Sequence, residues 1–311
     1  MAVLKVRIGA RASRLSRAQA SLVSSLISER VEDVALEFVP VKTLGDRLPP
    51  AEERKKLGRA GEKGAFTGDL EALLLQGKID IAVHSMKDLP SEETEGLMIG
   101  ATPPRSDPRD VLVSKGEGVR SLPRGARIGT SSLRRKAQLL KLRPDLDVVE
   151  LHGNVDTRLR MVAEGLDGLR GVVLAAAGLQ RLGEAARISQ TFSIAQMVPA
   201  VGQGIIAVQI REDDRELETL LSRITDVSAA TESLCERAFA RRLGVDCNVP
   251  VGGCAKASGG KVKIVGVIAR PDGGDYRKDS EEGPKGSASD VGRRLAERLI
   301  ENGPQRRDLD P

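Results

Sequence analysis

Residues 3–27 read VLKVRIGARASRLSRAQASLVSSLI, and this stretch indicates the fold class. Apolar and polar side chains alternate from Val3 to Ile8, as in a strand, and Gly9 ends the run. Ser13 is a suitable helix N-cap, and the apolar residues after it recur at helical spacing: Leu15, Ala18, Leu22, Leu26 and Ile27. The stretch therefore predicts a strand, a turn and a helix, the unit from which α/β domains are built.

The same alternation of strands and helices continues along the chain. A first series predicts a strand over residues 34–41, a loop rich in Gly and Lys over 42–66, a helix over 67–76 and a buried strand over 79–84. A second series repeats the order: strand 127–129, helix from Ser132, strand 148–151, helix from about Val155 and strand 171–175. Such alternation predicts doubly wound parallel sheets, which bind ligands at the carboxyl ends of their strands.

The last third of the chain departs from this rhythm. A Gly202-Gln203-Gly204 turn precedes a strand over 205–210, which we expect to return to the first sheet. Two helical stretches follow, then a strand over 262–268 and a final helix over 290–301. Residues 271–289 are rich in turn formers and are predicted to be a mobile loop.

Composition limits the class of function. The 311 residues suffice for two or three domains, and 49 basic beside 44 acidic residues make a mixed surface with a formal charge of only +5. With no Trp, one Tyr and four Phe, the chain lacks the stacking platforms of single-stranded nucleic-acid binders, so we expect no nucleic-acid partner. The first residues lack a long apolar stretch, which predicts a cytoplasmic protein with no membrane partner.

The three cysteines are sparse and odd in number, which argues against a disulfide framework. Cys247 and Cys254 have six residues between them and both histidines are distant in sequence, so we predict no metal site. Cys235 lies in a predicted helix and is interpreted as a core residue. Cys247 lies in a loop, Gly244 to Pro250, where an accessible thiol could carry a covalent adduct.

Two strand ends carry small hydroxyl residues together with arginines. Strand 127–129 is followed by Thr130, Ser131, Ser132, Arg134 and Arg135, and the first strand is followed by Arg11 and Ser13. Free backbone N–H groups and the helix dipole favour an anion at such a helix start, and arginine can bind a carboxylate with two hydrogen bonds. The alternative is a capped helix with arginines in solvent; because cations are disfavoured at helix starts, we favour the anion site.

Further basic groups lie after other predicted strands and in the first long loop. His152, Arg158 and Arg181 follow later strands. Arg59 and Lys63 lie in a Gly-rich loop that differs from a nucleotide-binding P-loop, because the lysine is misplaced and no Ser or Thr follows it. ATP binding is therefore rejected, and a basic lid over an anionic ligand or a solvated linker remain as alternatives.

The run His84-Ser85-Met86-Lys87-Asp88 lies directly after a predicted strand. A carboxylate at this position, Asp88, can stabilise a developing cation or move protons. The alternative is a surface pair of Lys87 and Asp88. His84 itself is interpreted as a satisfied core histidine rather than as a base or ligand.

Five segments together closely resemble the hydroxymethylbilane synthase family, also called porphobilinogen deaminase. They are residues 84–88, 129–135, 153–155, 199–204 and the loop around Cys247, and they follow one another in the family's order over nearly the whole chain. The resemblance implies three domains: residues 1–103 with 199–221, residues 104–198, and residues 222–311. The first two would form a pair like that of periplasmic binding proteins, and the third would be a small α/β domain in a monomeric protein.

The resemblance also implies a reaction. A dipyrromethane cofactor would be joined to Cys247 by a thioether, four porphobilinogen molecules would be added with loss of ammonia, and hydrolysis would release hydroxymethylbilane. Asp88 matches the family's catalytic carboxylate. The residues that match positions binding the carboxylates of cofactor and substrate are Arg11, Ser13, Arg59, Lys63, Lys87, Thr130, Ser131, Ser132, Arg134, Arg135, His152, Arg158 and Arg181.

Three positions depart from the family pattern. His152 stands where arginine is usual, Arg59 where lysine is common, and Asp246 places a carboxylate beside Cys247, which would raise the pKa of the thiol. The main rival hypothesis is a non-enzymatic, two-domain binding module for a small acidic ligand.

Overall fold

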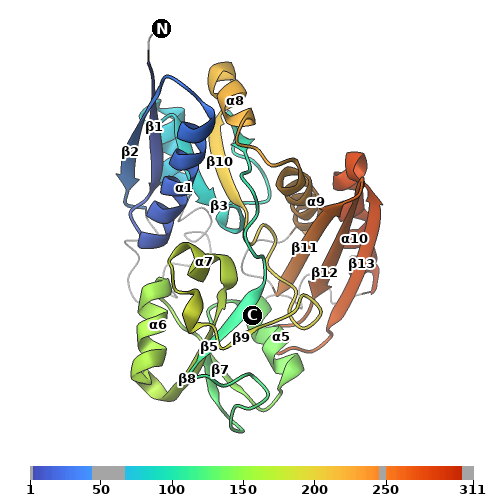
Figure 1. Ribbon diagram of the computed structural model, residues 1–311. Coiled ribbons are helices and arrows are strands. Elements are labelled where there is room, and N and C mark those ends of the chain that lie inside the picture. Colours follow the sequence, from blue (N-terminus) through green and yellow to red (C-terminus); the bar gives the residue numbers. More distant parts are fainter. Residues whose placement is uncertain (1–2, 44–66, 245–249, 303–311) are drawn as a thin grey trace. The chain divides into compact units, whose positions relative to one another are not determined.

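The computed structural model describes residues 3–43, 67–244 and 250–302. The chain forms two compact units, the first made of Met1–Arg105 with Ile205–Ala230 and the second of Ser106–Gly204 with Thr231–Pro311 (Figure 1). The chain therefore passes between the units at residues 105–106, at residues 204–205 and within a long helix.

The first unit contains a five-stranded sheet of order β2-β1-β3-β10-β4. Its strands are β1 (Leu4–Arg11), β2 (Val34–Val41), β3 (Ile81–Ser85), β4 (Leu97–Ala101) and β10 (Ile206–Arg211). Its helices are α1 (Arg14–Arg30), α4 (Gly68–Leu75), the 3₁₀ turn η2 (Met86–Asp88) and α8 (Arg215–Ser222). The predicted strand, turn and helix of residues 3–27 are confirmed, and so is the return of residues 205–210 to this sheet.

The side chains of this sheet alternate between two apolar layers. Ile81 and Val83 belong to one layer, together with buried residues of α1 and α8, whereas Ala82 belongs to the other, with residues of α4. This alternation is the period-two pattern of a strand covered on both faces. The helices therefore lie on opposite faces of the sheet, as doubly wound domains require.

The second unit contains a sheet with the same topology, of order β7-β6-β8-β5-β9. Its strands are β5 (Asp110–Ser114), β6 (Arg127–Gly129), β7 (Asp147–Val149), β8 (Leu169–Ala175) and β9 (Gln190–Thr191). Its helical segments are α5 (Leu133–Leu142), α6 (Val155–Glu164), η3 (Leu166–Gly168), α7 (Ala176–Arg181) and η4 (Ala185–Arg187). The two sheets are thus a pair of similar α/β layers, as the resemblance implies.

The prediction of wholly parallel sheets is wrong in one respect. In the first sheet β10 is antiparallel to β3 and β4, and in the second sheet β5 is antiparallel to β8 and β9. Parallel neighbours need a crossover of a dozen or more residues, usually a helix. Each of these strands instead enters its sheet a few residues after the chain crosses from the other unit, so no crossover helix sets its direction.

A smaller three-stranded sheet lies in the C-terminal part of the second unit. It has the order β11 (Val251–Ser258), β12 (Lys261–Ile268) and β13 (Arg277–Pro284), and its helical segments are α9 (Val227–Leu243), η5 (Lys285–Ser287) and α10 (Ala288–Asn302). Cys235 is fully buried, as predicted, and a Cβ on Gly292 would lie 2.0 Å from its carbonyl oxygen, so α9 and α10 meet backbone to backbone. The prediction of a mobile loop over 271–289 is wrong, because β13 and η5 occupy most of it.

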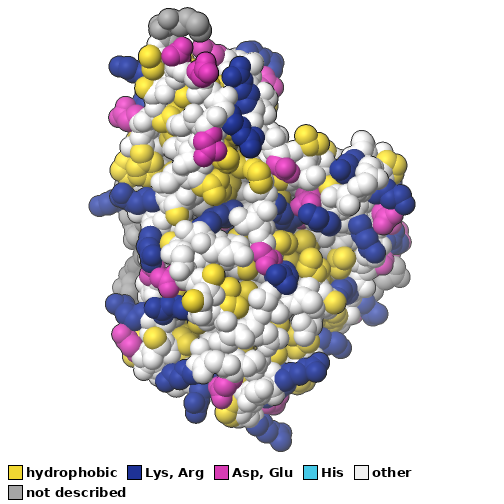
Figure 2. All heavy atoms as spheres, in the orientation of Figure 1, with side chains coloured by type: hydrophobic (Ala, Val, Ile, Leu, Met, Phe, Trp, Pro, Cys, Tyr) yellow, Lys and Arg dark blue, Asp and Glu magenta, His cyan; other side chains and the backbone are white. Residues whose placement is uncertain are grey.

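Two further observations bear on the class of protein. Within the described ranges, no helix has the length and apolar character needed to cross a membrane. On the face shown in Figure 2, basic and acidic side chains are interspersed, as their near-equal numbers predict.

Candidate active site

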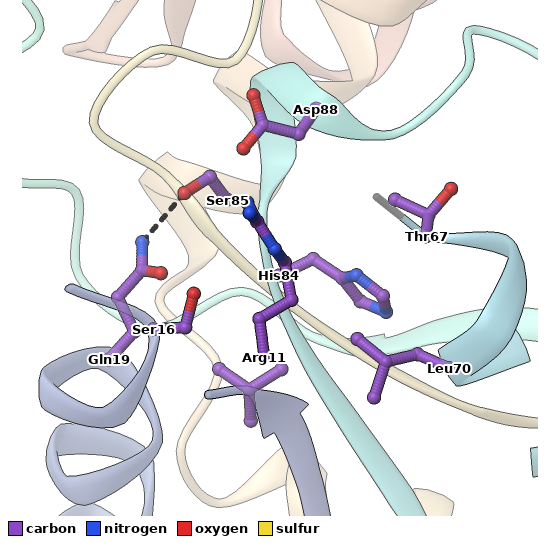
Figure 3. Close-up of a pocket in the computed structure, with 9 residues that line it drawn as sticks. Arg11, Ser16, Gln19, Thr67, Leu70, His84, Ser85 and Asp88 are labelled. Atoms are coloured by element: carbon purple, nitrogen blue, oxygen red, sulfur yellow. Dashed lines mark hydrogen bonds between the residues drawn. The ribbon is translucent and has the colours of Figure 1, made fainter. Parts of the chain in front are cut away.

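A small pocket in the first unit brings together residues from five elements (Figure 3). Its volume is about 20 Å³, room for about one water molecule. The residues that line it include Arg11 at the end of β1, Gln19 of α1, Thr67 before α4, His84 of β3 and Asp88 of η2. Arg11 and Asp88, which are distant in sequence, therefore line one pocket.

The position of Asp88 is set by the neighbouring residues of its turn and not by contacts of its own side chain. The turn η2 begins directly after β3, and its Leu89 N–H donates to the Met86 carbonyl at 3.1 Å. Met86 and Leu89 are 2% and 7% exposed, while Asp88 is exposed. Two buried side chains thus anchor a turn that presents a carboxylate at the carboxyl end of a central strand.

His84 is a core residue, as predicted, and is 4% exposed. Burial lowers the pKa of its imidazole to about 4 against the opposing effect of a hydrogen bond with Gln209, so it is neutral at neutral pH. Its Nε2 and the Thr67 Oγ1 are both buried, and neither has a hydrogen-bond partner within the part of the chain that the structure describes. Both residues line the pocket beside Asp88, so the pocket has an unsatisfied polar wall.

Ser13 and Gln19 organise the start of α1. Ser13 accepts a hydrogen bond from the Ser16 N–H at 3.2 Å and is therefore the N-cap, as predicted. Gln19, which the sequence did not reveal, is 2% exposed and donates from Nε2 to the Ser85 Oγ at 2.8 Å. This bond, drawn in Figure 3, ties α1 to the strand that carries the Asp88 turn.

The second unit contains a buried cluster of one carboxylate and two arginines. Asp110 is fully buried; it accepts a hydrogen bond from Arg134 Nη1 at 2.6 Å and another from Arg135 Nε at 2.8 Å. Burial alone would raise the pKa of Asp110, but the two positive charges outweigh burial and lower it to about 2. Gln203 Nε2 donates to the same carboxylate at 3.1 Å.

The structure rules out the alternative in which Arg134 and Arg135 lie in solvent. Their side chains are 4% and 7% exposed and both form ion pairs with Asp110. Ser132 caps their helix, accepting from the Arg135 N–H at 3.4 Å. The cluster of two cations and one anion is positively charged overall, so it still favours an anion nearby. No sequence signal pointed to Asp110, because it lies 24 residues before Arg134.

Arg158 is a half-buried cation beside this cluster. It donates from Nε to the Gly153 carbonyl at 2.8 Å and from Nη2 to the Ser131 Oγ at 3.2 Å. Burial, followed by the positive charge of Arg135, lowers the pKa of Arg158 to about 10. It makes no ion pair with any carboxylate of the described residues. A cation held in place without a counter-ion is suited to bind an anionic ligand.

The other predicted site residues are distributed as follows. Arg181 makes no ion pair with a described carboxylate either, and burial lowers its pKa to about 10. Thr130 is buried and its Oγ1 accepts from the Ser132 N–H at 3.2 Å, whereas His152 Nε2 lies 3.0 Å from a carboxylate oxygen of Glu150. Lys87 is half-buried next to Asp88. Arg59, Lys63 and Cys247 lie outside the described residues.

Comparison with known proteins now identifies the family. The model "Porphobilinogen deaminase, dipyromethane cofactor binding domain" matches residues 6–219, and the model "Porphobilinogen deaminase, C-terminal domain" matches residues 230–301. The chain belongs to the porphobilinogen deaminase family. Its predicted membership, its role in tetrapyrrole biosynthesis and the dipyrromethane cofactor are thereby confirmed, and the binding-module hypothesis is not favoured.

Curated relatives agree along nearly the full length. Porphobilinogen deaminase of Syntrophotalea carbinolica is 45% identical over 303 residues, covering 97% of this chain and 94% of the relative. That of Pelotomaculum thermopropionicum is 45% identical over 300 residues, covering 96% and 94%. Among solved structures, the Methionine Binding Protein MetQ aligns with a TM-score of 0.44 and 13% identity over 71% of this chain and 89% of its own. A likeness this weak adds nothing to the family assignment.

Proposed function

We propose that this member of the porphobilinogen deaminase family couples four porphobilinogen molecules head to tail on a dipyrromethane cofactor bound to Cys247 by a thioether. One ammonia is lost at each addition, and hydrolysis releases hydroxymethylbilane. The observation that supports this most is Arg158, a positioned cation beside a second positive charge and without a carboxylate partner among the described residues.

The ligands of such a reaction carry many carboxylates, because every pyrrole unit bears an acetate and a propionate group. An anion at Arg158 would offset both its burial and its repulsion from Arg135. The residues present therefore fit a polycarboxylate cofactor, which would be held by Arg158, Ser131 and the start of α5. When bound, the dipyrromethane group supplies the nucleophilic pyrrole carbon to which the first substrate is added.

Asp88 is the proposed catalytic carboxylate. Loss of ammonia from porphobilinogen leaves a positive charge shared between the methylene carbon and the pyrrole ring. A carboxylate that accepts hydrogen bonds from pyrrole N–H groups would stabilise this charge and then favour loss of the proton that restores the aromatic ring. The exposed Asp88, on a turn anchored by Met86 and Leu89, provides such a group.

Other parts of the proposal rest on the family resemblance. They are the thioether at Cys247, the binding roles of Arg59 and Lys63, and the assignment of His152 in place of the usual arginine. We further propose a monomer that acts in the cytoplasm.

The replacement Asp88→Asn tests the catalytic role. It keeps the size and hydrogen-bonding reach of the side chain but removes its charge, so the rate of ammonia release should fall at least about a hundredfold. Asp213→Asn is the matched control, because Asp213 is an exposed carboxylate of the same unit. Circular dichroism of both variants should match the wild type. Near-normal ammonia release from Asp88→Asn would show that another group performs this step.

A further inference from the structure

Two of the segments in which the chain passes from one unit to the other are hydrogen-bonded to each other. The Ser106 N–H donates to the Gly204 carbonyl at 3.1 Å, which joins the residue after one crossing to the residue before the other. Gly204 has φ +88°, and a Cβ added to it would lie 2.5 Å from the Ser106 carbonyl oxygen. The two segments therefore approach so closely that only glycine fits at this position.

Arg181 contacts both of these segments, Ser106 and Gly204, which together we call the junction. Its Nη2 donates to the Gly204 carbonyl at 2.7 Å and to the Ser106 Oγ at 3.1 Å, so one nitrogen contacts both segments. Arg181 ends α7, which begins directly after β8 of the second unit. The family resemblance assigned this side chain to ligand carboxylates, but its described hydrogen bonds all go to the crossings.

The neighbouring residues fix the same junction within the second unit. Gln203 Nε2 donates to the Pro108 carbonyl at 2.7 Å. The buried Glu236 accepts from the Gly202 N–H at 2.6 Å and from the Ala255 N–H at 2.7 Å. Residues 202–204 are thus held to α9, to β11 and to the start of β5, and Arg181 holds their last carbonyl.

One residue further along, the chain holds the Asp88 turn. Ile205 follows Gly204, and its carbonyl accepts the Met86 N–H at 3.0 Å, at the first residue of η2. Ile205 is 1% exposed and packs in one apolar cluster with Met86 and Leu89. Arg181, Gly204, Ile205 and the Asp88 turn are therefore linked by consecutive hydrogen bonds and one peptide bond.

From these contacts we infer that Arg181 is a positioning residue for Asp88, acting through the Gly204–Ile205 junction. This role of Arg181 is additional to the binding of ligand carboxylates. Its effect on turnover rests on the function proposed above. Loss of the Arg181 bonds frees the Gly204 carbonyl to shift, and with it the peptide that anchors η2. Turnover should then fall. Substrate affinity should not change as long as residue 181 carries a positive charge, because affinity depends on that charge.

Hydrogen–deuterium exchange of the full-length protein tests the junction without reference to activity. Arg181→Lys keeps the charge but has a shorter reach, and it should speed exchange of the Ser106 and Met86 amides about tenfold. Ser106→Ala leaves Arg181 intact and removes one of its bonds, so it should speed exchange in the same direction to a smaller extent. Arg187→Lys, at an exposed arginine paired with Glu184, is the control and should leave these amides unchanged.

Steady-state kinetics test the consequence for catalysis. Arg181→Lys should lower kcat about tenfold with KM within about twofold of wild type, and Ser106→Ala should lower kcat to a smaller extent. A raised KM at unchanged kcat, with amide exchange as in wild type, would show that Arg181 serves only as a ligand cation and would overturn the inference. If Arg181→Lys fails to fold, unchanged exchange in Ser106→Ala would overturn it. Faster exchange in the two variants, together with a wild-type protein that does not consume porphobilinogen, would refute the proposed function but support the role of Arg181 at the junction.

Discussion

Replacing Asp110 by asparagine should cost this protein much of its stability. Asp110 is fully buried and accepts hydrogen bonds from Arg134, Arg135 and Gln203. Asparagine keeps the shape but removes the only negative charge of the cluster, leaving two arginines that are 4% and 7% exposed without a counter-ion. Removal of one partner from a buried ion pair typically costs about 3–5 kcal/mol.

The same carboxylate should make the wild type sensitive to acid. Its pKa lies at about 2 in the folded protein, against an ordinary value of 3.8. The lowered pKa stabilises the folded state above pH 3.8, and this contribution is lost as the pH falls toward 2. The difference corresponds to about 2.5 kcal/mol. Asp110→Asn has no proton to bind at this position, so its stability should lack this part of the acid-side decline.

Urea unfolding at several pH values, followed by circular dichroism, measures both effects. Asp147→Asn is the matched control in the same unit, because Asp147 pairs with Arg127 and both side chains are about half exposed. Its free energy of unfolding should change by less than about 1 kcal/mol. An Asp110→Asn variant as stable as this control at neutral pH, or one whose stability declines below pH 4 as steeply as that of the wild type, would show that the Asp110 charge does not stabilise the cluster.

Two further substitutions test particular contacts. His84→Leu should flatten the pH dependence of stability: the pKa of His84 is lowered from 6.5 to about 4, so its contribution is full above pH 6.5 and about 3 kcal/mol of it is lost by pH 4. Urea unfolding at pH 7 and pH 4 measures this, and an unchanged slope would show that another group titrates. Gly204→Ala should destabilise the folded state by more than about 1 kcal/mol, because of its positive φ and the 2.5 Å approach to Ser106; a melting temperature equal to that of wild type would contradict the described junction.

Local pattern was sufficient to predict most of the elements of the two larger sheets. The helix starts at Ser13 and Ser132 follow from side chains that cap the next turn, and strand β10 was expected in the first sheet. These features depend on residues close together in sequence or on simple apolar runs. The repeated series of strands and helices indicated two similar units, but the strand order that the two sheets share was not evident, because strand order is set by pairing.

Strands β4, β5, β9, β11 and β13 were not predicted, and for β11 and β13 the structure gives the physical reason. In β13 the sequence RKDSEEGP carries almost no apolar side chain, since the strand lies at the edge of its sheet and is largely exposed. In β11 two glycines weaken the strand pattern, and a Cβ at Gly253 would lie 2.9 Å from the ring of the buried Phe239. In both cases tertiary contacts, rather than intrinsic propensity, set the strand.

The positions of the basic side chains could be predicted from the sequence, but their partners could not. Strand-end arginines correctly marked where positive charge gathers, yet the sequence could not distinguish Arg158, which has no described counter-ion, from Arg134 and Arg135, which are engaged by Asp110. That distinction depends on a residue from another strand. The part played by Arg181 at the crossings likewise depends on contacts with Ser106, 75 residues away.

The proposed function requires that a two-pyrrole cofactor is bound covalently to Cys247. Intact-mass measurement of the purified protein beside Cys247→Ser tests it most directly, after incubation of both with porphobilinogen. We predict that the wild type carries the added mass of at least two linked pyrrole units and that the variant carries none. An unmodified wild type after incubation, or the same added mass on Cys247→Ser, would contradict the account.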